Sequence, residues 1–323
     1  MTKIENLPQA VTAEFYQEAI DTFWAESRNF MVSLYRAGNI NFPGLSDLDL
    51  VAVPKQRPFA PLMLSVLHVL PDKFRAILLH NTLIVPQSHL AIFRYSALSN
   101  LTHMHGEPIL PDQPANYVPE HAACDVLERL YNYSLFWARQ DLLGVIDVRF
   151  SVAVCSSIRF TMNQMADLGI PGDANYGSEF DAMRKGLMRD RSVSHILKMI
   201  EYSRQTYQGC LLAVRDAWGI NAENRREVVS VITGAVALSP QFNPDIIRER
   251  FRAITEYLRD LVRLRYWYGN VVSVAVHERE EVPLWYYAMA PLAQRWRRAC
   301  RALGLRTKRD NARFGASPLR PGS

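Results

Sequence analysis

Residues 31–54 read MVSLYRAGNINFPGLSDLDLVAVP, and this stretch decides the fold of the N-terminal part of the chain. Asp47 and Asp49 flank one leucine and lead directly into the apolar run 50–53, which predicts a buried β-strand. Alternate residues of a strand share a face, so the two carboxylates are expected side by side. Carboxylates held this close repel each other unless a cation lies between them. Because Mg²⁺ favours carboxylate and phosphate oxygens, Asp47 and Asp49 are predicted to bind this metal.

The residues before this pair predict a turn that holds phosphate groups. Ser33 follows a short apolar segment, and thirteen residues separate it from Asp47. The intervening segment is rich in residues that form turns, so its backbone can approach a ligand closely. A hydroxyl, a guanidinium and free backbone N–H groups are suitable partners for a polyphosphate. The predicted nucleotide-binding residues are Ser33, Arg36, Gly38, Gly44 and Ser46.

This arrangement resembles the signature of the polymerase-β-type nucleotidyltransferase superfamily: a hydrophobic residue, Gly-Ser, a spacer, and then Asp-hydrophobic-Asp-hydrophobic. Ser33 and the run Asp47-Leu48-Asp49-Leu50 carry the resemblance, which covers about the first 110 residues. It implies a small mixed-sheet domain in which the serine and its turn hold the nucleotide phosphates. It also implies that Asp47 and Asp49 are catalytic and hold one or two Mg²⁺ ions, which activate the α-phosphate.

Two positions differ from the family pattern. Val32 stands where the family has the glycine of Gly-Ser. The family also has a third carboxylate on a later strand, but the segments 75–85 and 89–95, which are predicted strands, contain neither Asp nor Glu. His80 and Asn81 are the nearest polar residues, and Glu107 is another candidate replacement. These differences leave open a non-catalytic protein that keeps the fold to bind a nucleotide or a protein partner.

Two histidine patterns allow functions other than nucleotidyl transfer: metal binding for the first, and ribonuclease chemistry for the second. His103 and His105 alternate like residues on a strand, but Gly106 predicts a loop, where they would be ordinary polar residues. Arg189 and His195 have a spacing similar to the Arg-His motif of helical HEPN-type ribonucleases. The alternative for this second pair is a surface loop that leads into a helix.

The organisation of the chain changes near Ala115. Before it, a helix is predicted over 12–28 and an apolar, helix-like run over 58–70. After it, apolar residues recur at helical spacing almost throughout, with helices expected over 120–146, 147–168, 179–188, 194–218, 225–238, 243–268 and 284–303. The predicted fold class is α+β: a mixed-sheet nucleotidyltransferase domain at 1–115, followed by an all-α helical bundle at 116–305 that shapes the acceptor pocket. Residues 306–323 are expected to form a basic, disordered tail.

The net charge of +5 is concentrated at the C-terminus. Residues 1–118 contain 8 basic and 10 acidic residues, and residues 119–294 contain 20 basic and 21 acidic residues. Residues 295–323 contain 9 basic residues and one acidic residue. Such a segment is typical either of a solvated helix end and tail or of a surface that contacts nucleic acid.

The remaining sequence features indicate a cytoplasmic protein. The four cysteines are far apart and have no paired spacing, which predicts reduced, packed thiols. No leader peptide is predicted, and the apolar stretches are too short to cross a membrane. The expected reaction is Mg²⁺-dependent transfer of a nucleoside monophosphate from an NTP to a small-molecule acceptor, with release of pyrophosphate. The alternatives are a non-catalytic nucleotide- or protein-binding module and an enzyme that acts on nucleic acid.

Overall fold

A computed structural model describes residues 3–55, 70–79, 82–95, 101–109, 118–190 and 192–218, together with ten residues in the range 243–257. It contains helices and a small mixed sheet, which confirms the predicted α+β class. The predicted helices over 58–70, 225–238 and 284–303, the domain boundary near 115 and the basic tail lie outside the described residues. No helix in the described ranges is long and apolar enough to cross a membrane.

The central sheet has four strands in the order β4-β3-β2-β5. β2 (Met31–Ala37) and β3 (Asp49–Pro54) are antiparallel, as expected for two apolar segments joined by a turn-rich loop. The short strand β4 (Leu83–Ile84) runs parallel to β3, and β5 (Leu101–Gly106) runs antiparallel to β2. The strand predicted directly after the two aspartates is therefore confirmed and is an inner strand of the sheet.

The predicted strand over 89–95 is wrong, and the one predicted over 75–85 is a strand only at β4. Residues 89–95 form part of the 3₁₀ helix η3 (Gln87–Tyr95), and most of 75–85 lies in the 3₁₀ helix η2 (Asp72–Ile77) or outside regular structure. The loop predicted around His103 is instead the edge strand β5. Short apolar runs are compatible with either a strand or a helix turn, and tertiary pairing decides between them.

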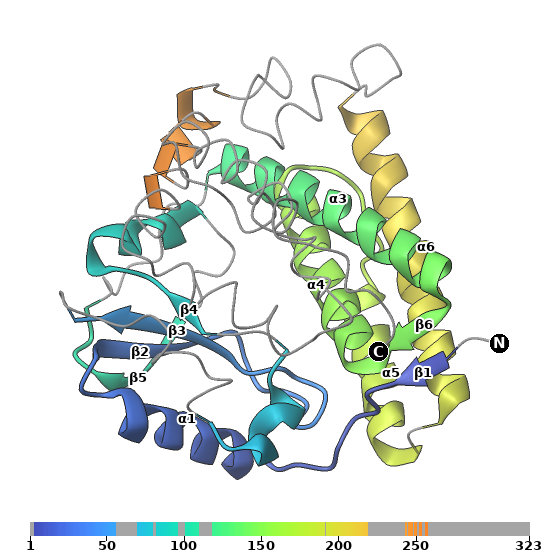
Figure 1. Cartoon of the computed structure of the whole chain (residues 1–323). Helices are drawn as coiled ribbons and strands as arrows, with labels where there is room; N and C mark the ends of the chain where they lie inside the picture. The colour runs from blue at the N-terminus through green and yellow to red at the C-terminus, as the bar shows by residue number, and fades with distance from the viewer. Residues whose placement is uncertain are drawn as a thin grey trace, which may run out of the picture.

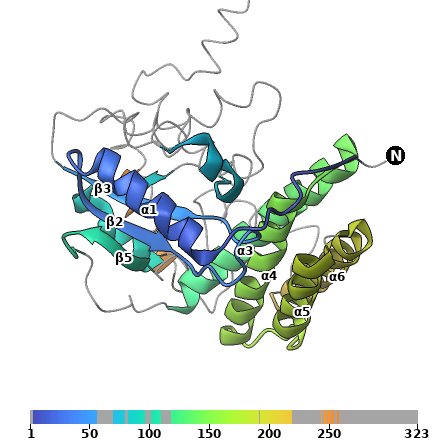
Figure 2. The same ribbon diagram turned by 90° about the horizontal axis from the view of Figure 1, so that it is seen from below.

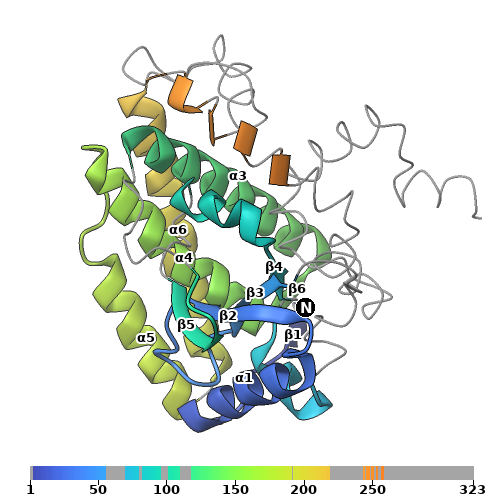
Figure 3. The same ribbon diagram turned by 90° about the vertical axis from the view of Figure 1, so that its left-hand side faces the viewer.

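One face of the sheet is covered by α1 (Ala13–Ser27), as Figures 1 and 2 show. Tyr16, Ile20 and Phe23 of this helix are fully buried, and their three- and four-residue spacing forms its apolar face. In Figure 3, α1 lies below the strands and α3 lies above them. The helix predicted over 12–28 is confirmed.

The four long helices confirm most of the predicted C-terminal pattern. They are α3 (Pro119–Leu143), α4 (Val148–Asp167), α5 (Tyr176–Asp190) and α6 (Val193–Ala217). Local chemistry fixes their ends: Gly144 ends α3 in a left-handed conformation, and the side chain of Asp147 caps the start of α4. Cys124, Cys155 and Cys210 are buried among these helices as thiols outside any disulfide, as predicted.

Two hydrophobic clusters make up the core, and each takes residues from the other half of the sequence. One cluster joins the sheet to α1 and includes Tyr257, whose hydroxyl donates to the carbonyl of Ile84 at 2.8 Å. The other lies among the long helices and includes Leu45. In addition, β1 (Lys3–Glu5) pairs in parallel with β6 (Val145–Asp147). These three connections join the N-terminal and helical parts of the chain.

Candidate functional site

The register of the sheet decides which face carries Asp49. His105 pairs with Leu34 and stacks on Trp24 of α1, with ring centroids 5.4 Å apart, so Leu34 lies on the α1 face. Asp49 is paired with Ala37, three residues farther along β2. Paired residues share a face and neighbouring residues alternate, so Asp49 lies on the face away from α1. Asp47 comes two residues before Asp49, in the segment that leads into β3.

The same register separates Arg36 and Ser33 from Asp49. Arg36 is paired with Leu50 and therefore lies on the α1 face. Ser33 is fully buried within β2 and paired with Val53, so it does not begin the turn as predicted. Its position is four residues from that of Asp49 along the strands, or about 13 Å. The turn begins at Gly38, which follows the last residue of β2 and has a φ of +70°.

The loop over residues 38–48 is packed against the rest of the protein. Gly44 has a φ of +90°, and a Cβ there would lie 2.1 Å from the carbonyl oxygen of Gln9. The Ser46 side chain accepts a hydrogen bond from the Phe42 backbone N at 3.2 Å, while its carbonyl accepts from Tyr16 at 2.5 Å. Gly44 and Ser46 thus shape the loop, whereas a Cβ at Gly38 would meet open space.

Two arginines of the helical part lie beside this loop, and no local sequence pattern indicates either of them. Arg184 of α5 is buried; its guanidinium carbon lies 3.8 Å above the Phe42 ring, and its Nη2 is 3.4 Å from the Ser46 hydroxyl. Arg149, at the start of α4, donates to the carbonyl of Arg75 at 3.2 Å. The Nη2 of Arg149 is buried without a hydrogen-bond partner among the described residues.

Electrostatics connects both arginines with Asp47. Burial lowers the pKa of Arg149, and the negative charges of Asp147 and Asp47 oppose this change. Burial likewise lowers the pKa of Arg184 to about 10, against the charges of Asp181 and Asp47. A negative charge keeps a nearby guanidinium protonated. The charge of Asp47 therefore acts on a pair of arginines, which supply positive charge at this end of the site.

A bulge divides the two histidines of β5. Tyr35 pairs with His103, but the next residue back along β2, Leu34, pairs with His105, so Met104 is an extra residue. His103 contacts the ring of Tyr35 edge-on, with centroids 5.3 Å apart. His105 turns to the α1 face, where its Nε2 lies 2.8 Å from Asp21 Oδ1. The two rings therefore do not form a pair of metal ligands.

The described strands place no carboxylate next to Asp49 on β5. Leu101 and His103 occupy the face of β5 that Asp49 shares across β2. Glu107 lies beyond the other end of this strand, where its backbone N donates to the carbonyl of Val32. Val32 is five residues from Ala37, about 17 Å along a strand, so Glu107 is not positioned as a third carboxylate. His80 and Asn81 lie outside the described residues.

The donor chemistry of Asp47 and Asp49 fits a hard divalent cation, because both offer carboxylate oxygens. Within the described residues, no group of three or more His, Cys, Asp or Glu side chains is placed to hold a metal. A Mg²⁺ ion bound by this pair would take its other ligands from substrate phosphates and water, as this ion commonly does.

The second histidine pattern forms a local contact. His195 Nδ1 lies 2.8 Å from Asp190 Oδ1, which also accepts from the backbone N of Ser192 at 2.8 Å. The Ser192 hydroxyl caps α6. His195 and Asp190 are exposed, with 41% and 50% of their side-chain surface accessible. Such contacts are typical of a surface segment that leads into a helix, which is the alternative given above to a ribonuclease-type Arg-His motif.

Comparison with known proteins gives no relative: no protein-family model matches the chain, no curated protein matches it, and no solved structure matches it. The arrangement of its own residues is therefore the basis for a functional proposal.

Proposed function

We propose that the chain is a nucleotidyltransferase that transfers a nucleoside monophosphate from an NTP to a small-molecule acceptor and releases pyrophosphate. The observation that carries this proposal is the position of Asp49. It begins an inner strand, on the face away from α1, and Asp47 precedes it by two residues. Bound Mg²⁺ would neutralise charge on the reacting phosphates. Asp47 and Asp49 would hold this ion, and the helical part would form the acceptor pocket.

The arginines refine the proposed binding of the triphosphate. Arg149 has a buried Nη2 that is free to donate, and the charge of Asp47 favours its protonated form. A guanidinium in this state is a strong phosphate partner. We therefore assign phosphate contacts to Arg149 and to the backbone at Gly38. Gly44 and Ser46 would act indirectly by shaping the loop, while the positions of Ser33 and Arg36 do not support direct contact.

The decisive experiment is calorimetric titration of the full chain with each of the four NTPs and a non-hydrolysable analogue, with and without Mg²⁺. Asp49→Asn should abolish the Mg²⁺-dependent part of binding while leaving the circular dichroism spectrum unchanged. Asp72→Asn is the matched control, because it removes an exposed carboxylate whose partner is the neighbouring Arg75. Equal Mg²⁺-dependent binding by wild type and Asp49→Asn would refute the proposal.

A second candidate is a non-catalytic binding module, and the arginines favour it. Because Arg149 and Arg184 already supply positive charge near Asp47, this carboxylate has a structural use without a metal. Such a protein would bind NTPs without a Mg²⁺ requirement, or would bind none, and would show no release of pyrophosphate.

An enzyme acting on nucleic acid is the third candidate, and it depends on the basic segment 295–323. Deleting this segment should leave a small-molecule enzyme almost unchanged. A nucleic-acid enzyme would instead lose RNA or DNA affinity, and the salt dependence of binding would become less steep.

A further inference from the structure

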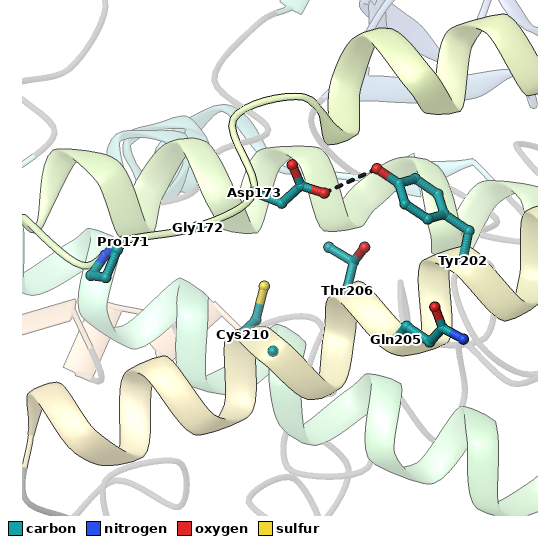
Figure 4. Close-up of a pocket in the computed structure, with 8 residues that line it drawn as sticks. Pro171, Gly172, Asp173, Tyr202, Gln205, Thr206 and Cys210 are labelled. Carbon is teal, nitrogen blue, oxygen red and sulfur yellow. Dashed lines mark hydrogen bonds between the residues drawn. The ribbon is translucent and has the colours of Figure 1, made fainter.

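A pocket of about 430 Å³ lies between α6 and the loop that joins α4 to α5. This volume is within the range of small-molecule sites. Its walls include Gly172 and Asp173 of the loop and Tyr202, Thr206, Gly209 and Cys210 of α6. In Figure 4, the side chains of Thr206 and Cys210 point from α6 toward the loop, and Asp173 reaches toward Tyr202.

The pocket has a negatively charged end. Asp173 is the one acidic residue of the lining, which contains no basic residue. Its Oδ2 accepts from the Tyr202 hydroxyl at 3.0 Å, and its Oδ1 accepts from the backbone N of Asn175 at 3.0 Å. Among the residues that the structure describes, Asp173 forms no ion pair with a basic side chain. A positively charged ligand would supply this partner.

Tyr202 is held as a neutral ring beside the carboxylate. Burial and the nearby carboxylates of Glu179 and Asp173 raise its pKa, so the hydroxyl keeps its proton. Its ring stacks on Tyr176, with centroids 5.4 Å apart and planes inclined at 22°. A carboxylate next to a fixed aromatic ring is a favourable environment for an ammonium group, through charge pairing and cation–π attraction.

Gly209 adds no side chain to the wall of the pocket. It lies in α6, where glycine destabilises a helix by about 0.5–1 kcal/mol relative to alanine. A Cβ at this position would meet no atom within 4 Å, so packing within the protein does not require glycine. The neighbouring Cys210 adds a neutral wall, because burial raises the pKa of its thiol to about 11.

From this geometry we propose that the pocket binds a small organic amine in its protonated form. The ammonium group pairs with the Asp173 carboxylate beside the Tyr202 ring, and the apolar body of the ligand extends past Thr206 toward Cys210. The pocket is separate from the Asp47 loop. Tyr176, whose ring stacks on Tyr202 of the pocket, lies in α5 eight residues before Arg184, which contacts that loop. Eight residues of helix span about 12 Å. The proposal therefore does not depend on nucleotidyl transfer.

Phenethylamine is a suitable probe, and 2-phenylethanol is its uncharged counterpart. Calorimetry on the full chain should show saturable binding of the amine, and binding of the alcohol should be about tenfold weaker or more. Asp173→Asn should weaken amine binding by a similar factor, because the amide still accepts from Tyr202 but carries no charge.

A filling variant gives an independent test. Gly209→Leu should block the amine without loss of helical structure. Gly186→Leu is its control, because Gly186 lies in α5, does not line the pocket, and also has open space at its Cβ. No saturable binding of phenethylamine to wild type would overturn the proposal. Unchanged affinity in both Asp173→Asn and Gly209→Leu would overturn it equally.

Discussion

Replacing Gly44 by alanine tests whether the 38–48 loop is a packed structural element. The φ of +90° at this position is unfavourable for any residue with a side chain, at a cost of about 1–2 kcal/mol. The new Cβ would also lie 2.1 Å from the Gln9 carbonyl oxygen, so backbone has to move. Overpacking of this kind costs about 1–3 kcal/mol. We therefore expect Gly44→Ala to lower the free energy of unfolding by about 2–5 kcal/mol.

Gly38→Ala is the matched control for this experiment. Gly38 has a similar φ of +70°, but its Cβ would meet no atom within 4 Å. This variant should show the backbone effect alone, about 1–2 kcal/mol. The difference between the two variants then isolates the contact with Gln9.

Equilibrium unfolding in urea, followed by tryptophan fluorescence and circular dichroism, measures both variants. The slope with denaturant should stay constant, so that the shift in midpoint reports stability. If Gly44→Ala is no less stable than Gly38→Ala, the close contact of the loop with Gln9 is refuted. Conversely, a loop whose main role is to hold phosphates would lose NTP affinity in Gly44→Ala without losing stability.

Three further predictions concern charge and burial. Asp47→Asn should lower the free energy of unfolding in urea by about 1–2 kcal/mol, because Arg149 and Arg184 lose a nearby negative charge. The loss should be smaller in a protein that already carries Arg184→Met. Equal losses with and without Arg184→Met would contradict an interaction between Asp47 and Arg184. Burial and the charge of Arg250 lower the pKa of His121 below its ordinary value of 6.5. Below pH 6.5 the unfolded chain therefore binds more protons than the folded protein, and the free energy of unfolding should fall as the pH drops. On acidification, the melting temperature of His121→Gln should fall less than that of the wild type. If the two proteins show the same dependence of melting temperature on pH, protonation of His121 does not cause the loss of stability. Burial raises the pKa of Cys210 to about 11 from 9.0, so this thiol should react with iodoacetamide at pH 8 about a hundredfold more slowly than a cysteine peptide. Mass spectrometry of the modified peptide measures this rate. A rate like that of the peptide would refute the effect of burial on Cys210.

Local sequence patterns predicted most of the regular structure. Helix α1, strand β3 and helices α3 to α6 were expected from apolar periodicity and from breaks such as Gly169, close to where they occur. The pattern failed for short segments: residues 89–95 are apolar and β-rich in composition, yet they form a 3₁₀ helix. The strand β5 was missed because Gly106 and Pro108 resemble a loop signal, whereas pairing with β2 decides the structure.

The environment of the two aspartates was less predictable. Alternation along one strand can be read from sequence, but the bulge that separates His103 from His105 depends on a partner strand some seventy residues away. Arg184 reaches Ser46 across 138 residues of sequence, so no local signal connects them. Register and long-range contacts, which set the faces of Arg36 and Asp49, arise only when the chain folds.

The exchange of residues between the two hydrophobic clusters has a consequence for synthesis of the protein. Translation proceeds from the N-terminus, so β2 and β3 leave the ribosome long before Tyr257, whose ring completes their core. Leu45 likewise packs only after the long helices have been synthesised. Strand β1 pairs with β6, whose residues lie about 140 positions later in the chain. The sheet therefore cannot reach its final packing as an early, independent intermediate. Nascent chains halted before Tyr257 should remain open to chaperones and proteases.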